Sequence, residues 1–115
     1  MKETAKAYYL GKKGPQRLNC AQSIAETLRE KFPLDEANMK LFSTCGGGRA
    51  PEGYCGAFYA TKSILERYAP QSAAEKMESL QSFAGSLKCR EIKALKKKSC
   101  LECIGQAVEA VVGTS

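Results

Sequence analysis

The sequence predicts an all-α protein, and three observations support this fold class. Apolar residues recur three and four positions apart along most of the chain, which is the period of an amphipathic helix. Little of the chain shows the apolar-polar alternation that is typical of a strand. Glycine and proline stand at the ends of the periodic segments. We therefore expect a single domain over residues 1–115, a bundle of about five to six helices with a Gly-rich, Cys-bearing loop.

Three helices are predicted before the glycine-rich loop. Residues 2–10 form an amphipathic helix that ends at a glycine. A second helix covers residues 19–32 and is stopped by a proline, with Asn19 as its N-cap and Gln22 three residues later. A shorter helix follows over residues 35–44 and ends at a run of glycines.

The loop itself is the segment CGGGRAPEGYCG, residues 45–56, which contains five glycines and a proline and has no helical period. Its spelling matches neither the dinucleotide-binding fingerprint nor the phosphate-binding loop. Helical spacing returns over residues 57–68 and again over residues 73–87, where Gly85 weakens the pattern near its end. The following cysteine-bearing stretch has no defined state.

The last helix is the most clearly marked. Ser99 and Glu102 have the capping-box spacing, and a stripe of Leu, Ile and Val residues follows them. Cys100 then occupies the first helical position and Cys103 lies one turn further on. Free backbone N–H groups and the helix dipole favour negative charge there, and three lysines at 96–98 add positive potential. Such surroundings lower the pKa of thiols in redox-active proteins.

Cysteine is abundant and histidine is absent. The chain has six cysteines and no histidine: Cys20, Cys45, Cys55, Cys89, Cys100 and Cys103. Without histidine there is no Ser-His or Cys-His nucleophile pair, no C-x-x-C-H haem attachment and no mixed Cys/His zinc site. Cys20 and Cys55 also begin predicted helices, so three segments place sulfur at a helix N-terminus. A single cysteine such as Cys45 is more often a small buried apolar residue.

Charge and hydropathy indicate where the protein acts. The net charge is +6, with basic residues spread over several helices and concentrated near residues 93–98. No helix-turn-helix or aromatic-strand pattern accompanies them, so we expect no nucleic-acid binding. No leader-like segment and no apolar run long enough to span a bilayer is present, so we expect a cytoplasmic protein without membrane contact. Its partner would be an unidentified redox protein, and its wide apolar helix faces are compatible with a homodimer.

Four local contexts resemble the C_GCAxxG_C_C family of redox-active proteins. They are NCAQSI at 19–24, GGGRAPEGYCGAFYA at 46–60, GSLKCREI at 85–92, and Cys100 with Ile104 four residues later. Their order and spacing agree over most of the chain. The resemblance implies a small all-helical protein.

The resemblance also implies which cysteines matter. The family cysteines correspond to Cys20, Cys55, Cys89 and Cys100. The family is similar to a segment of split-Soret cytochrome c that carries a cysteine-bound iron-sulfur centre, although the haem motif is absent here. Ala60 stands where the family usually has glycine, the stretch between the last two family cysteines is short, and Cys45 and Cys103 are additions.

The leading hypothesis is electron transfer through a [2Fe-2S] cluster held by four thiolates. Its ligands would be Cys20, Cys55, Cys89 and Cys100, and Cys103 could replace one of them. Backbone N–H groups of the loop glycines would contact the cluster sulfides or an anion, and these glycines are Gly46, Gly47, Gly48, Gly53 and Gly56.

Two alternatives remain open, and whether the protein is an enzyme is left undecided. The first is metal-free thiol-disulfide chemistry, with Cys100 as the attacking thiolate and Cys103 or Cys89 as its resolving partner. The second is a structural all-thiolate zinc site in a binding module. Zinc sites commonly use two C-x-x-C pairs, whereas this chain has one, which favours the thiol-disulfide alternative.

Overall fold

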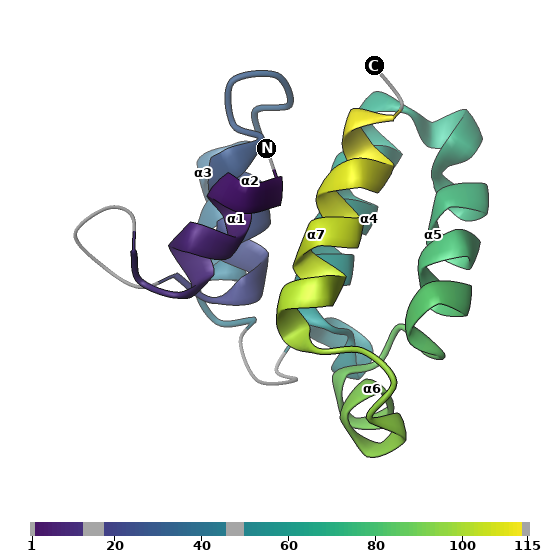
Figure 1. Ribbon diagram of the computed structural model, residues 1–115. Helices are drawn as coiled ribbons and strands as arrows, with labels where there is room; N and C mark the ends of the chain where they lie inside the picture. Colours follow the sequence, from purple (N-terminus) through teal and green to yellow (C-terminus); the bar gives the residue numbers. More distant parts are fainter. Residues whose placement is uncertain (1, 13–17, 46–49, 114–115) are drawn as a thin grey trace.

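The computed structural model describes residues 2–12, 18–45 and 50–113, and it confirms the all-α class (Figure 1). The described elements are α1 (Lys2–Tyr9), α2 (Cys20–Thr27), α3 (Glu36–Phe42), the short 3-10 helix η2 (Pro51–Gly53), α4 (Gly56–Tyr68), α5 (Pro70–Ala84), α6 (Cys89–Leu95) and α7 (Cys100–Val112). These ranges contain no strand, only an isolated β-bridge between Tyr54 and Lys88. Within these ranges, no helix combines the length and the hydrophobicity that a bilayer span requires.

The described residues form seven α-helices, one more than the upper limit of the predicted five to six. The additional helix is α6. This helix has only seven residues, and Ile92 is its single buried side chain. A helix of two turns with one buried residue has no repeat that a periodicity argument can detect. The sequence therefore left its state undefined, and the structure supplies it.

The second helix is shorter than predicted. It ends at Thr27 rather than near Phe32, and turns cover the residues between them. The apolar period continues past the helix because Leu28 and Phe32 remain buried, and the Phe32 N–H donates to the Leu28 carbonyl at 2.8 Å. The Phe32 ring packs edge-on against Tyr68, with centroids 5.4 Å apart. Periodicity thus reported burial correctly and overestimated the helix length.

The core lies where α4 packs against α2, α5 and α7, while α1 covers α2 and α7. Many of its largest fully buried side chains come from these central helices, among them Ile24, Phe58, Ile64, Ile104 and Val108. Burying side chains of this size stabilises a fold by about 1.5–3 kcal/mol each. The central helices therefore form a firm base for the residues at their ends.

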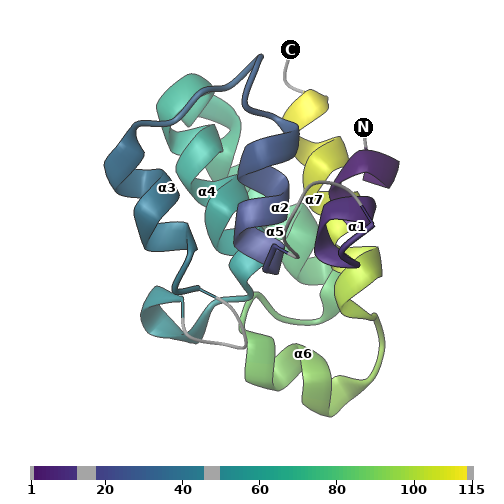
Figure 2. The same ribbon diagram turned by 90° about the vertical axis from the view of Figure 1, so that its left-hand side faces the viewer.

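The N-terminal ends of α2, α4 and α7 lie at the same end of the molecule, and α6 lies there too (Figures 1 and 2). The arrangement follows from the connections, because α3 and α5 return the chain to this end before the next helix begins. Each of these four helices begins at or next to a cysteine. We call this region the cysteine end.

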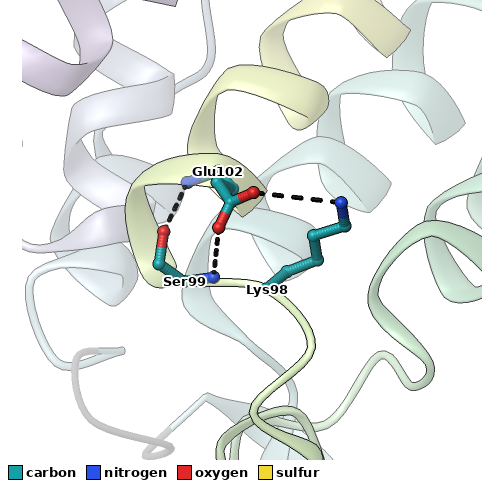
Figure 3. A network of polar contacts seen from close by, with 3 residues as sticks. All are labelled: Lys98, Ser99 and Glu102. Atoms are coloured by element: carbon teal, nitrogen blue, oxygen red, sulfur yellow. Dashed lines mark hydrogen bonds and ion pairs between the residues drawn. The ribbon is translucent and has the colours of Figure 1, made fainter.

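The start of α7 confirms the predicted capping box (Figure 3). The Ser99 hydroxyl accepts from the Glu102 N–H at 3.1 Å, and the Glu102 carboxylate accepts from the Ser99 N–H at 3.0 Å. These hydrogen bonds hold the pKa of Glu102 below its ordinary value, and the Lys98 ammonium, 3.9 Å away, acts in the same direction. The position of Cys100, next to Ser99, is fixed by this cap.

Candidate functional site

Cys20 is the first residue of α2, and its position is set by Asn19. The Asn19 side chain accepts from the Gln22 N–H at 2.8 Å, and the Gln22 side chain accepts from the Asn19 N–H at 3.0 Å. This is the predicted capping box. The Asn19 amide also donates to the Phe42 carbonyl at 2.8 Å, which ties the start of α2 to the end of α3. The position of Cys20 is therefore fixed both by the cap of its own helix and by the contact with the end of α3.

Cys55 precedes α4 as its N-cap residue, and the segment between α5 and α6 holds it in place. Its N–H donates to the Leu87 carbonyl at 2.8 Å, and Tyr54 forms the β-bridge with Lys88. Its side chain is buried, with 8% of its surface exposed. The same contacts bring the start of α6, and with it Cys89, next to the start of α4.

The Cys20 sulfur lies against the backbone of Gly56, the residue that follows Cys55, and a hydrogen bond joins it to the Cys55 thiol. This hydrogen bond lowers the pKa of Cys20 from 9.0 to about 6 against the opposing effect of burial, and backbone N–H groups of Ala57 and Ala21 add to the lowering. The pKa of Cys55 is raised, first because its thiol hydrogen-bonds to Cys20 and second because it is buried. The pair therefore consists of a thiolate at Cys20 and a protonated thiol at Cys55.

Gly56 makes this close approach possible. A Cβ atom at this position would lie 2.5 Å from the Cys20 sulfur, 2.8 Å from the Cys45 carbonyl oxygen and 3.3 Å from the Ala21 nitrogen. The first two distances are shorter than any stable contact, and the second involves backbone that cannot turn away. Glycine is therefore required where α4 begins against α2.

Replacement of Gly56 by alanine is expected to destabilise the protein by about 1–3 kcal/mol, the usual cost of overpacking, and to slow alkylation of Cys20. The added methyl group displaces the Cys20 sulfur and presses on the Cys45 carbonyl. Urea unfolding measures the first effect, and the rate of reaction with iodoacetamide, followed by mass spectrometry, measures the second.

Gly53→Ala is the matched control. Gly53 has φ +78°, so alanine is strained there, but no atom lies within 4 Å of the added Cβ. This variant should lose stability and keep the wild-type alkylation rate of Cys20. A Gly56→Ala protein with wild-type stability and wild-type Cys20 reactivity would contradict the packing argument.

Cys45 and Cys103 are buried and protonated. The Cys45 thiol donates to the Leu41 carbonyl at 3.3 Å, and burial raises its pKa. Burial raises the pKa of Cys103 to about 12, and negative charge on Cys100 and Glu102 acts in the same direction. Neither sulfur is a ready nucleophile, because the thiolate is the reactive form.

Cys89 and Cys100 are the first residues of α6 and α7, Cys89 partly buried and Cys100 exposed. All four family cysteines thus stand at a helix start at the cysteine end. Three of these starts were predicted, and the fourth, at Cys89, follows from α6.

The loop glycines divide into two groups. Gly46, Gly47 and Gly48 lie outside the described residues. Gly53 ends η2 and has no atom within 4 Å of an added Cβ, whereas Gly56 is buried against Cys20. Of Gly53, Gly56, Gly85 and Gly113, Gly56 alone lies against a cysteine sulfur.

The described side chains do not fit a preformed metal site. No three His, Cys, Asp or Glu residues within the described ranges lie close enough together to hold one metal ion. Cys20 and Cys55 are brought together, but the four-thiolate cage that an iron-sulfur cluster or a structural zinc ion needs is not formed with Cys89 and Cys100.

Sequence reasoning did not pair Cys20 with Cys55. Each cysteine was placed at a helix start, and a glycine directly after Cys55 is a local sign of a close approach. The local sequence pattern does not predict which helix approaches that glycine. The pairing depends on how α2 packs against α4.

The fold and the site together define an all-α, cysteine-rich protein with a hydrogen-bonded thiol pair at one end of a helical bundle. Residues 18–113 match the family model described as "Putative redox-active protein (C_GCAxxG_C_C)", so the chain belongs to this redox-active family. The resemblance seen in the four cysteine contexts is thereby confirmed. Comparison with curated proteins and with solved structures finds no match.

Proposed function

We propose that this protein is a thiol-disulfide redox protein in which Cys20 attacks a substrate disulfide and Cys55 resolves the product. The observation that carries the proposal is the contact between a partly accessible thiol and a buried one, held by two different helices. Resolving cysteines must reach the attacking sulfur and must not compete with it. The buried, protonated Cys55 meets both conditions.

The reaction consists of two exchange steps. The Cys20 thiolate attacks one sulfur of the substrate disulfide, the substrate S–S bond breaks, and a mixed disulfide and one free thiolate result. Cys55 then transfers its proton to the leaving group and attacks the Cys20 sulfur, which releases the second substrate thiol. The substrate gains two electrons from the protein, one proton from Cys55 and one proton from the solvent, and the protein is oxidised to a Cys20–Cys55 disulfide. An external dithiol returns it to the reduced state.

The alternative pair of Cys100 with Cys103 has less support. Cys100 is exposed and Cys103 is buried, so burial alone does not separate this pair from Cys20 and Cys55, and the difference is whether the two thiols meet. No hydrogen bond joins these two thiols in the described part of the chain. Cys103 would leave its buried position before it could resolve a mixed disulfide.

Equilibration of the protein in a series of glutathione redox buffers tests the proposal. Thiols are trapped by alkylation, and disulfides are assigned by peptide mass spectrometry. We expect Cys20 and Cys55 to form a disulfide first, while Cys100 and Cys103 stay reduced and are therefore alkylated when the thiols are trapped. Cys55→Ser should stop at a Cys20–glutathione mixed disulfide, and Cys100→Ser should behave as wild type. First formation of a Cys100–Cys103 disulfide, or no change in any pair, would overturn the proposal.

A [2Fe-2S] cluster is the second candidate. What favours it is that Cys20, Cys55, Cys89 and Cys100 all start helices at the cysteine end, where backbone N–H groups are available to sulfide. The helix starts would have to close together, because no three ligands are gathered in the described arrangement.

Anaerobic purification followed by iron, sulfide, zinc and visible-absorption measurements separates the candidates. Iron and sulfide that are bound by the wild type and lost in Cys89→Ser would establish the cluster. Bound zinc without redox activity would establish the structural zinc site. A colourless protein that cannot be reconstituted with iron and sulfide and still forms the Cys20–Cys55 disulfide would support thiol exchange.

We also infer a cytoplasmic location. All six cysteines lie as free thiols, and cysteine-rich chains in oxidising compartments generally pair theirs in structural disulfides. A reducing compartment also supplies the dithiol that the proposed cycle needs. Fractionation of cells that express the protein tests this inference.

A further inference from the structure

The most strongly charged surface at the cysteine end belongs to α6 and the turn that follows it. Five exposed basic residues form this α6 basic surface: Lys88, Arg90, Lys93, Lys96 and Lys97. Glu91 is the only acidic residue in this segment, and its carboxylate accepts from the Ser86 hydroxyl at 2.7 Å. The surface therefore carries a dense positive charge in a chain whose net charge is +6.

This positive charge is not balanced by neighbouring acids. Ion pairs elsewhere in the described residues each join two residues of one local segment: Lys6 with Glu3, Arg29 with Glu26, Lys62 with Glu66, and Lys98 with Glu102. Within the described ranges no acidic side chain pairs with any member of the α6 basic surface. Uncompensated charges of one sign attract a partner of the opposite sign over about one Debye length.

The α6 basic surface adjoins the thiol pair. Lys88 forms the β-bridge to Tyr54, and the preceding residue accepts the Cys55 N–H at 2.8 Å. Lys93 lies one turn beyond Cys89 on α6, so these two side chains share a face of the helix. Figure 2 shows α6 at the end of the molecule where α2 and α4 begin.

An apolar side chain stands within this charged surface. Leu95 is 55% exposed, which is more than any other large hydrophobic residue in the described part of the chain. It also packs at Gly85, where an added Cβ would lie 2.6 Å from its Cδ1 atom. An apolar contact point with a polar rim is the usual composition of a protein-protein interface.

We propose that the α6 basic surface docks the protein partner whose disulfide reacts at Cys20, and that this partner carries acidic residues around its disulfide. The inference rests on the proposed function. The surface runs along seven residues of helix, about 10 Å, and continues into the next turn, which exceeds the reach of a small disulfide but suits a polypeptide. Exposed aromatic residues that would stack on nucleic-acid bases are absent from residues 86–99.

The test uses three synthetic disulfide-linked peptides that differ only in flanking residues, which are acidic, neutral or basic. Formation of the Cys20–Cys55 disulfide in reduced protein is followed by acid quench, alkylation and mass spectrometry. We expect the acidic peptide to react about tenfold faster than the neutral one at low salt, and the basic peptide to react more slowly. High salt should reduce these differences, because it screens exposed charges.

Two double variants locate the effect. Lys93→Glu with Lys97→Glu should remove the preference for the acidic peptide. Lys31→Glu with Arg67→Glu changes the net charge equally at exposed positions in the turn after α2 and the last turn of α4, away from the cysteine end, and should retain most of the preference. Circular dichroism checks that both variants are folded.

The outcomes separate the docking proposal from the proposed function. If the neutral peptide does not yield the Cys20–Cys55 disulfide in wild type, the proposed function fails. If it does, but the three peptides react at equal rates or the two double variants behave alike, the docking proposal is overturned. Equal peptide rates, combined with an oligonucleotide that binds wild type and not the Lys93→Glu, Lys97→Glu variant, would assign the surface to nucleic acid.

Discussion

Replacing Cys20 by serine is expected to abolish the rapid reaction of the reduced protein with iodoacetamide near neutral pH and to end disulfide exchange. The pKa of Cys20 is about 6, because the Cys55 thiol and backbone N–H groups hydrogen-bond to its sulfur. Cys45, Cys55 and Cys103 have raised pKa values and stay protonated under the same conditions. Among these four thiols, Cys20 should therefore react fastest.

The expected rate advantage of Cys20 over an ordinary thiol depends on pH. At pH 7 a thiol with a pKa of about 6 is roughly 90% thiolate, whereas one with a pKa of 9.0 is about 1% thiolate. The lower pKa also weakens the nucleophile, with a Brønsted coefficient of about 0.4–0.5, which cancels much of the gain. The net advantage over an ordinary thiol is several-fold at about pH 7 and tens of fold at about pH 5.

The measurement is the alkylation rate of each cysteine from about pH 4 to 9. In wild type the Cys20 rate should rise with a midpoint near pH 6, and Cys20→Ser should lose this fast phase. Cys100→Ser is the control, because it removes an exposed thiol outside the hydrogen-bonded pair. A fast phase that survives in Cys20→Ser, or a Cys20 midpoint near 9, would show that the pair does not activate this sulfur.

The free energy of unfolding of the reduced protein is expected to rise between about pH 6 and 9 and to fall at higher pH. The folded pKa of Cys20, about 6, lies below the unfolded value of 9.0. Its contribution is therefore fully present above pH 9.0 and is lost as the pH falls through 6. The full shift corresponds to about 4 kcal/mol, and partial solvent exposure of the sulfur lowers the expected gain to about 2 kcal/mol.

The fall above pH 9 comes from the buried thiols. Cys45, Cys55 and Cys103 have folded pKa values above 9.0, so the unfolded chain loses these protons first. Their stabilising contribution is complete below pH 9.0 and is lost as the pH rises through each folded value, which for Cys103 is about 12. Stability should consequently be highest near pH 9.

Urea unfolding in excess reductant at a series of pH values measures the curve. Difference curves between variants remove the contributions of lysine and tyrosine titration. Cys20→Ser should flatten the rise between pH 6 and 9, and Cys103→Ala should reduce the fall at higher pH. A wild-type curve that is flat from pH 6 to 9 would contradict the hydrogen-bonded thiolate.

Helix starts were the best predicted part of the fold. Both capping boxes, Asn19 with Gln22 and Ser99 with Glu102, are present in the structure, because their hydrogen bonds close within three residues of chain. Helix ends and short helices were less well predicted. The second helix ends before Phe32, and α6 has too few buried residues to show a period.

The amino-acid sequence by itself determined that this is a helical protein and that three of its four family cysteines, Cys20, Cys55 and Cys100, begin or directly precede helices, because caps, glycines and apolar periods act between near neighbours in the chain. The tertiary structure alone decided which sulfurs meet. Cys20 reaches Cys55 because α2 packs against α4 at Gly56, and because the Cys55 N–H bonds to Leu87 beyond α5. Contacts between distant segments depend on how whole helices pack, and no local pattern encodes them.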